Sequence, residues 1–95
     1  MTDFQVSGIV DGDTFDVSGG WTWNNQKGDR VRPTGYDAPE LSEPGGQAAK
    51  NRLTNLILNR TVQIGPAHTV DRGRLVADVS FNGRNLADYF PEYKT

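Results

Sequence analysis

The segment Arg74–Phe81 constrains the fold more than any other part of this sequence. Apolar residues occupy every second position in it, at Leu75, Ala77, Val79 and Phe81. Because successive side chains of a β-strand point to opposite faces, this spacing places the four on one face of a strand. Asn82-Gly83, which follows directly, is typical of a tight turn. The sequence therefore predicts a strand with one apolar face, followed by a reversal of the chain.

Four further strands are expected along the chain. They are predicted at residues 4–10, 14–17, 30–36 and 61–64, with loops at 18–20 and 24–29. Asp11-Gly12-Asp13 is a hairpin signal between the first two strands. Gly65-Pro66 is expected to end the strand that begins at residue 61.

One long helix is predicted after residue 46. Its apolar positions share one helix face and are Ala49, Leu53, Leu56 and Ile57. Arg60 is expected at its C-terminal end, where the helix dipole favours positive charge. Asn85 is expected to cap a short helix that runs to Phe90 and is ended by Pro91. These elements predict a single domain over residues 1–95, mainly β with α: five strands in a small, highly curved barrel, one main helix and a short C-terminal helix.

The composition limits the partners of the chain. It has no cysteine, so neither a disulfide nor a thiolate metal site can form. A formal net charge of −2 argues against non-specific electrostatic binding of nucleic acid, so any phosphate must be bound by a few placed arginines. The chain begins without a signal segment and has no apolar run of membrane-spanning length. We therefore expect no membrane partner, and a protein that is cytoplasmic by default, or secreted if a precursor segment has been removed.

Residues 31–40 concentrate the polar chemistry. Arg32 and Asp37 would point to opposite faces of a straight strand, so they can meet only if the chain bends at Gly35. Pro39 stiffens the backbone between Asp37 and Glu40. A stiff turn with two acids suits a hard metal cation, which needs several oxygens at fixed positions. Taken alone, the same segment is also compatible with a turn whose acids cap backbone amides.

Each of the other charged fragments is weak evidence of function by itself, but their order along the chain is informative. DGDT at residues 11–14 is by itself a common hairpin turn, and DRGR at 71–74 is by itself typical of a charged surface loop. Along the chain stand DGDT, Arg32, DAPE at 37–40, an amphipathic helix and GRL at 73–75. This order resembles the staphylococcal-nuclease (thermonuclease) family over roughly residues 9–90. The resemblance implies a short member of that family, with a five-stranded oligonucleotide/oligosaccharide-binding barrel (OB-fold) and packed helices.

Position by position, the resemblance implies a calcium site. Asp13 and Asp37 would supply carboxylate ligands to Ca²⁺, and the main-chain carbonyl of Ala38 would be a further ligand. Asp11 would be an acid near the metal with a supporting role. An oxygen site with so few protein carboxylates keeps positions open for water and substrate.

The resemblance also implies the catalytic residues. Glu40 would position or deprotonate the attacking water, and Arg32 and Arg74 would grip the reacting phosphate. Phosphodiester hydrolysis needs a nucleophilic water, a metal that polarises the phosphoryl oxygen and positive charge for the negative charge that develops. Arginine suits the last task because its planar fork holds phosphate oxygens bidentately and keeps its proton.

The implied function is that of a calcium-dependent phosphodiesterase. It would be a monomer that hydrolyses single-stranded or duplex DNA and RNA at the 5′ P–O bond and leaves 3′-phosphate ends. Two alternatives stay open: a catalytically silent OB-fold module that binds nucleic acid or protein, and a calcium-stabilised structural module. The enzyme is favoured because silent relatives typically lack the acids or arginines, whereas a structural module has no need for two arginines directed at phosphate.

The chain departs from the family pattern in three places, one of which is that it ends soon after Phe90, without the last helix of the longer members. Pro33-Thr34 stands where members often carry Leu-Ile, and since proline removes a ladder donor, the strand is expected to lie at an edge or bulge there. The loop at residues 71–74 lacks a tyrosine that often lines the nucleotide pocket, so weak base stacking is expected.

Three further side chains have alternative interpretations. Trp21 and Trp23 lie two positions apart and would form either a stacking platform for unpaired bases or an apolar cover for the barrel. His68 is expected to be an exposed polar residue rather than a catalytic one.

Overall fold

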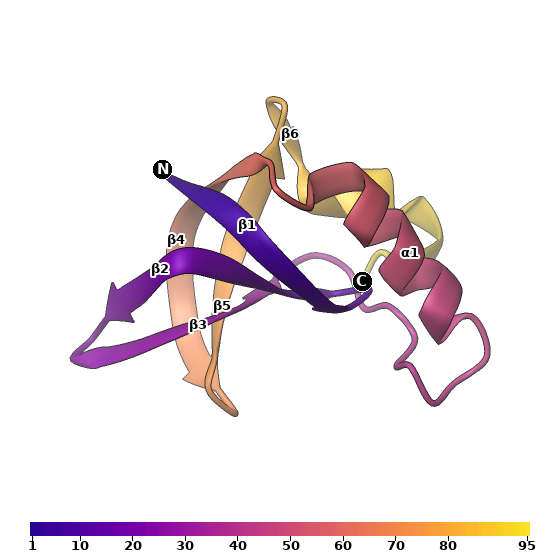
Figure 1. The fold of residues 1–95 in the computed structure, drawn as a ribbon, viewed down its shortest axis with the longest axis horizontal. Coiled ribbons are helices and arrows are strands. Elements are labelled where there is room, and N and C mark those ends of the chain that lie inside the picture. Colours follow the sequence, from indigo (N-terminus) through magenta and orange to yellow (C-terminus); the bar gives the residue numbers. More distant parts are fainter.

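A computed structural model describes residues 1–95, and its chain is mainly β-structure with one α-helix (Figure 1). The strands are β1 (Thr2–Asp11), β2 (Thr14–Trp23), β3 (Gln26–Pro33), β4 (Thr61–Asp71), β5 (Arg74–Phe81) and the two-residue β6 (Arg84–Asn85). The helices are α1 (Gly46–Ile57) and two 3₁₀ helices, η1 (Leu86–Tyr89) and η2 (Pro91–Tyr93). No helix is long and apolar enough to cross a membrane.

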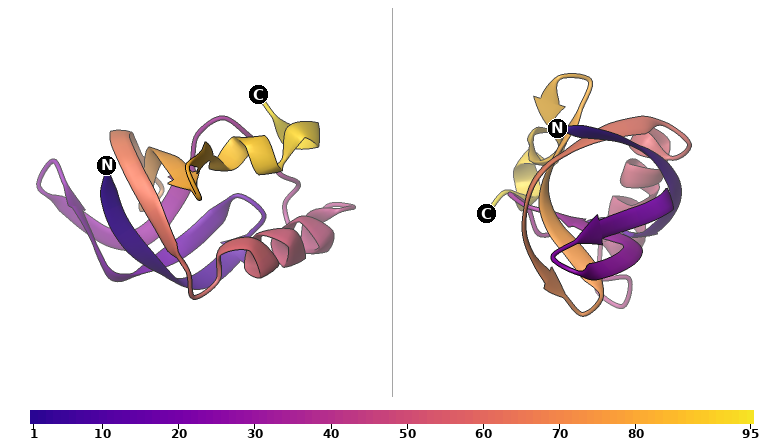
Figure 2. Two further views of the ribbon diagram at one scale, coloured as in Figure 1. Left: turned by 90° about the horizontal axis from the view of Figure 1, so that it is seen from above. Right: turned by 90° about the vertical axis from the view of Figure 1, so that its left-hand side faces the viewer.

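The sheet curls until its two sides meet. Its strand order is β3-β2-β1-β4-β5-β6, and neighbouring strands run antiparallel. An additional parallel pairing joins β3 to β5, with Val31 opposite Leu75. The right-hand view of Figure 2 shows the strands curving into the resulting ring. The structure therefore confirms the predicted five-stranded barrel of the OB-fold type.

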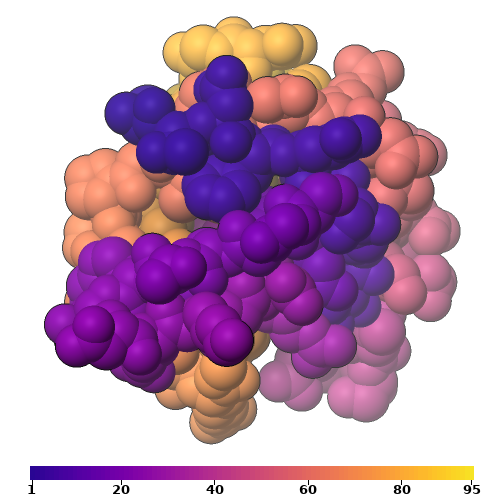
Figure 3. Space-filling model, turned by 60° about the vertical axis from the view of Figure 1, so that its left-hand side comes forward, coloured from indigo at the N-terminus to yellow at the C-terminus, as the bar shows by residue number.

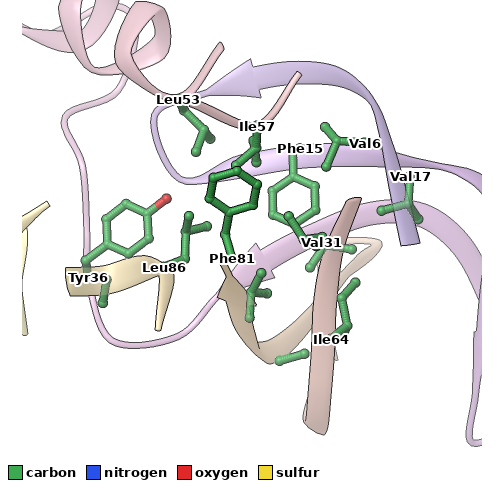
Figure 4. Close-up of a cluster of buried hydrophobic side chains, with 14 of the residues drawn as sticks. Val6, Phe15, Val17, Val31, Tyr36, Leu53, Ile57, Ile64, Phe81 and Leu86 are labelled. Carbon is green, nitrogen blue, oxygen red and sulfur yellow. The ribbon is translucent and has the colours of Figure 1, made fainter. Parts of the chain in front are cut away.

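The barrel interior and the inner face of α1 form one apolar core of 19 buried residues. The alternation that predicted β5 is confirmed, because its apolar positions Leu75, Ala77, Val79 and Phe81 are all buried. Figure 4 shows Phe15, Val31 and Phe81 gathered in this core. The helix contributes Gly46, Ala49, Leu53 and Ile57, and α1 lies with η1 and η2 at the same end of the barrel (Figure 1, Figure 2). This is also the end at which β3 leads into the candidate site.

The predicted loops at residues 18–20 and 24–29 are wrong, because both belong to a long β2–β3 hairpin. Gly19 and Gly20 take positive φ values of 77° and 70°, and the β2–β3 register shifts between Asp16 and Trp21. The glycines thus form a bulge, after which the strand continues. Only two residues, Asn24 and Asn25, form the turn. The hairpin, in purple, projects from the barrel in Figure 3.

Two predicted strand boundaries are also wrong. β4 runs through Gly65-Pro66 to Asp71. It tolerates Pro66 because β1 pairs with β4 only as far as Ile64, so beyond that point one side of β4 has no strand neighbour. The strand expected at residues 30–36 starts at residue 26 and ends at Pro33.

Pro33 lies where β3 has passed the end of its pairing with β2, as the edge prediction required. The last β2–β3 pair is Phe15 with Val31, so no β2 residue pairs with Pro33. On the other side, the N–H of Thr34 donates to the carbonyl of Ala77 at 3.0 Å. The missing proline donor therefore breaks no ladder hydrogen bond.

The helix ends differ from expectation in part. α1 stops at Ile57, so the exposed Arg60 lies beyond its last turn, where the dipole effect has fallen off. The predicted cap at Asn85 is present, since its side chain accepts a hydrogen bond from the N–H of Ala87. The short helix it caps is a 3₁₀ helix, and Pro91 begins η2.

Candidate active site

The β1–β2 turn presents Asp13 from a tightly packed position. A Cβ atom added to Gly12 would lie 2.6 Å from the Cβ of Ala49 and 2.9 Å from that of Ala38, so only glycine lets the turn approach α1 this closely. Asp13 is 6% exposed. Its Oδ2 accepts the N–H of Ala38 at 3.0 Å, and its own N–H donates to Asp11 Oδ1 at 3.1 Å. The turn is therefore fixed by packing and by hydrogen bonds on both sides of the carboxylate.

Arg32 and Asp37 meet because the chain bends between them, as the sequence predicted. Gly35 takes a positive φ of 93° at the bend. Arg32 Nη2 then lies 2.9 Å from Asp37 Oδ1 and 3.5 Å from Asp13 Oδ2. Its Nη1 donates to the carbonyls of Pro33 and Tyr36 at 3.0 and 3.1 Å. One guanidinium thus joins two carboxylates from separate turns.

The charge of Asp13 is only partly compensated. Burial raises the pKa of its carboxyl from 3.8 to about 7, and the hydrogen bond with Asp11 adds to the rise. The Arg32 guanidinium and the Ala38 N–H act in the opposite direction on this pKa, but they do not cancel the effect of burial. Additional positive charge beside Asp13 would favour its ionised form.

Arg74 reaches the same region from β5. It is the first residue of that strand and pairs in parallel register with Arg30 of β3. Its Nη2 lies 3.1 Å from Asp71 Oδ2. A cavity of about 390 Å³ is lined by residues from β3, the bend, the end of β4, β5 and the C-terminal residue: Arg32, Pro33, Thr34, Gly35, Tyr36, Asp37, Asp71, Arg74, Val76 and Thr95. The two predicted phosphate-binding arginines therefore share one pocket.

Glu40 does not join this group. Its side chain is exposed, makes no hydrogen bond or ion pair, and does not line the pocket. Its main-chain N–H donates to Glu43 Oε1 at 2.9 Å, and its carbonyl accepts the N–H of Glu43. The structure thus brings Asp13, Arg32 and Asp37 into direct contact, adds Arg74 through the pocket, and leaves Glu40 outside.

The oxygen donors near Arg32 fit a hard cation that keeps most of its positions for other ligands. No cluster of three or more His, Cys, Asp or Glu side chains could enclose a metal. The two carboxylates that converge are Asp13 and Asp37, and the Asp37 side chain is 68% exposed. Ca²⁺ takes 6–8 oxygen ligands, so water, a main-chain carbonyl and substrate would have to complete the set. The raised pKa of Asp13 marks a buried carboxylate that a cation would stabilise.

Sequence reasoning missed the structural role of Tyr36. Its hydroxyl donates to the carbonyl of Gly12 at 2.9 Å, and its ring stacks on Phe90 at 4.7 Å. The C-terminal residues also reach the bend, since the N–H of Asp37 donates to the carbonyl of Tyr93 at 2.9 Å. The only sequence signal was an aromatic residue between Gly35 and Asp37, which did not indicate its distant partners.

The tryptophans and the histidine lie outside the pocket. Trp21 is 4% exposed and its indole N–H donates to the carbonyl of Arg30 at 2.8 Å, so it covers the barrel and cannot stack on bases. Trp23 is partly buried and packs against the core. His68 is exposed as expected, with Nε2 2.9 Å from Asp78 Oδ1.

Fold and site together define an OB-fold barrel with Arg32, Arg74 and Asp37 at one surface pocket and the buried carboxylate of Asp13 3.5 Å from Arg32. No family model matches the sequence. The chain is similar to proteins named probable endonuclease LCL3: that of Paracoccidioides lutzii is 32% identical over 100 residues, and that of Coccidioides posadasii 35% identical over 98. Each alignment covers 79% of this chain but 29% and 32% of the respective relative, so the chain spans about a third of the length of the curated relatives it matches.

Proposed function

We propose that this chain is a nuclease domain of the staphylococcal-nuclease family that hydrolyses phosphodiester bonds of DNA or RNA with calcium. The observation that carries the proposal is the shared pocket, lined by Arg32 from β3, Arg74 from β5 and the carboxylate of Asp37. Two fixed guanidinium groups beside an oxygen-rich cation site are what a phosphodiester in the act of hydrolysis needs. The similarity to proteins named probable endonuclease supports the same class of reaction.

In the proposed reaction, the two arginines bind the non-bridging oxygens of the scissile phosphate. Arg32 is oriented by the carbonyls of Pro33 and Tyr36, and Arg74 by Asp71. The main-chain carbonyls keep both guanidinium groups oriented, while phosphate replaces Asp37 and Asp71 as the partners of Nη2 of Arg32 and Arg74. Little reorientation then accompanies the growth of negative charge on the phosphate. Both side chains are partly shielded from water, with exposed fractions of 21% and 24%, which strengthens their interaction with phosphate.

The carboxylates have separate tasks. Asp13, Asp37 and the carbonyl of Ala38 would hold Ca²⁺, which when bound polarises a phosphoryl oxygen. Glu40 accepts a proton from the attacking water, whose oxygen bonds to phosphorus while the bond from phosphorus to the 5′ oxygen breaks. The 5′ oxygen takes a proton from solvent water and leaves as a hydroxyl, and the phosphate stays on the 3′ end.

The second candidate is a silent OB-fold module that binds nucleic acid without cutting it. The observation in its favour is the position of Glu40, whose exposed carboxylate has no contact with the pocket. The nuclease therefore requires Glu40 to approach the phosphate when calcium and substrate are bound. A silent module requires no such approach.

The decisive experiment incubates the protein with single-stranded and duplex oligonucleotides of DNA and RNA, with calcium and then with excess chelator. If the chain is a nuclease, we expect cleavage with calcium, no cleavage with chelator, and 3′-phosphate ends by mass spectrometry. Binding without cleavage in a parallel anisotropy titration would establish the silent module instead. Absence of both binding and cleavage would contradict both the nuclease and the silent module that binds nucleic acid.

A further inference from the structure

Tyr36 connects the two turns that carry the candidate calcium ligands. Its side chain is 1% exposed, and its hydroxyl donates to the carbonyl of Gly12, the residue before Asp13. Burial keeps the pKa of this phenol well above its ordinary value, so it remains a donor. In the chain, Tyr36 is followed directly by Asp37. Tyr36 is thus hydrogen-bonded to the residue before Asp13 and joined by a peptide bond to Asp37.

The backbone of Tyr36 also orients Arg32. Its carbonyl accepts Nη1 of that guanidinium at 3.1 Å, while Nη2 faces the carboxylates of Asp13 and Asp37. A displacement of residue 36 would therefore change the mutual position of the three charged groups. Asp13 also links the two turns and the arginine, through the N–H of Ala38 and the guanidinium of Arg32, but it is itself one of the candidate ligands.

The ring of Tyr36 is held by a stack that reaches α1. Phe90 lies parallel to it, with ring centroids 4.7 Å apart and an interplanar angle of 2°. The guanidinium of Arg52 lies 4.7 Å from the centroid of Phe90. Arg52 also donates to the carbonyl of Tyr89 at 2.9 Å and pairs with Glu92 at 2.8 Å. Figure 4 shows Tyr36 beside Leu86 at the edge of the core, where this stack begins.

We propose that Tyr36 is a positioning residue: its hydroxyl bond to Gly12 sets the separation of Asp13 and Asp37, and thereby the affinity of the site for calcium and the rate of hydrolysis. The inference rests on the proposed function. Groups that orient metal ligands from outside the ligand shell typically change metal affinity or activity about 10–100-fold when they are removed. The hydroxyl of Tyr36 has this relation to Asp13.

Two matched variants separate positioning from stability. Tyr36→Phe removes one buried hydroxyl and keeps the ring stack. Tyr89→Phe is the control, because the hydroxyl of Tyr89 donates to the carbonyl of Phe81 at 3.0 Å and neither residue lines the candidate pocket. Each variant loses one phenol-to-carbonyl bond, so comparable decreases in melting temperature are expected.

The readouts are the calcium Kd by calorimetry and kcat and KM on an oligonucleotide at saturating calcium. For Tyr36→Phe we expect the calcium Kd to rise about tenfold or more and kcat to fall by a similar factor, with KM within about twofold of the parent. For Tyr89→Phe we expect calcium Kd and kcat within about twofold of the parent. If Tyr36→Phe does not fold, Phe90→Leu takes its place, because it removes the ring that stacks on Tyr36 and lets the hydroxyl move relative to Gly12. A smaller rise in the calcium Kd is then expected, and an unchanged Kd would contradict the positioning role.

The parent protein separates the two possible failures. If the parent binds calcium and cleaves, but Tyr36→Phe matches Tyr89→Phe, the positioning role is wrong and the proposed function stands. If the parent neither binds calcium nor cleaves, the proposed function fails and the inference fails with it.

Discussion

Asp13 and Glu40 belong to the same candidate site but lie in opposite surroundings. Asp13 is buried in a turn that packs against α1, and it contacts the N–H of Ala38 and the guanidinium of Arg32. Glu40 is exposed on the connection before α1, and its carboxylate has no partner. The barrel therefore fixes the groups that would bind charge, whereas the group that would act on water stands on a surface connection.

The difference suggests a division between stability and chemistry. Asp13 and the groups that contact it pack against the core, so their replacement should change folding as well as function. The side chain of Glu40 makes no hydrogen bond or ion pair, so its replacement should change function alone. Four predictions test this comparison, beginning with the largest expected effect.

Glu40→Gln should slow cleavage by about 10²–10⁴-fold, the range for loss of a general base. Its melting temperature and calcium Kd should match the parent, since exposed side chains without partners contribute little to stability. Glu43→Gln is the control: it removes a neighbouring charge but keeps an amide oxygen that can accept the N–H of Glu40. A Glu40→Gln rate within about twofold of the parent would remove Glu40 from the reaction.

Arg74→Lys tests the pocket at a residue that does not touch Asp13 or Asp37. Lysine keeps the charge but loses the planar fork, and removal of one preorganised donor costs about 10²–10³ in rate. Calcium affinity should be unchanged. Arg84→Lys serves as the control, because Arg84 lies over the ring of Tyr89 and not in the pocket. Equal rates for the two variants would show that charge alone, rather than bidentate binding, is what the pocket supplies.

The sequence predicted most of the fixed region because its signals are local. The alternation in β5 determines which side chains are buried, and the glycine at residue 35 indicated where Arg32 and Asp37 could meet. Non-local features were predictable only in part. The strand count predicted a barrel, but the bulge at Gly19-Gly20 depends on pairing with β3, and the pair of strands that closes the barrel, β3 with β5, joins segments far apart in the sequence.

The position of Glu40 and the role of Tyr36 were not predictable from the sequence, because both depend on contacts that no sequence motif specifies. The hydroxyl of Tyr36 finds its partner Gly12 24 residues away, so no spacing rule connects the two. Glu40 is exposed, and its main chain is hydrogen-bonded to Glu43, a local arrangement that the motif does not specify. A motif such as DAPE identifies the residue types for a reaction but leaves their mutual geometry undetermined.

Gly12→Ala should disturb the packing of the β1–β2 turn against α1 and lower the stability of the fold, without changing any charged group. The new Cβ would lie 2.6 Å from the Cβ of Ala49, so the turn or the helix must move. Overpacking of this kind typically costs about 1–3 kcal/mol of unfolding free energy. Gly8→Ala is the control in the same strand pair, because its Cβ would approach nothing closer than 3.7 Å. Urea denaturation of both variants measures the difference, and equal midpoints would show that the turn is not tightly packed against α1.

The last prediction concerns the pH dependence that Asp13 imposes. Its pKa is raised from 3.8 to about 7 by burial and by its hydrogen bond with Asp11. Between these values the folded protein holds a proton that the unfolded chain has lost, so metal-free stability from this group is fully present below about pH 4 and is lost as pH rises to about 7. Calcium needs the ionised carboxylate and must displace that proton.

Calcium affinity should therefore rise with pH by up to about tenfold per unit below pH 7 and level off above it. Calorimetry at several pH values in buffers of different ionisation enthalpy would show both the slope and the release of close to one proton per calcium below pH 7. Glu40→Gln should retain this pH profile, because Glu40 is not a proposed ligand. Asp13→Asn should lose calcium binding. Without calcium, the stability of Asp13→Asn should also no longer decline between about pH 4 and pH 7. If calcium binds without proton release throughout this range, the buried carboxylate of Asp13 is not a calcium ligand. The proposed contrast between a buried metal-binding acid, Asp13, and an exposed catalytic acid, Glu40, is then wrong.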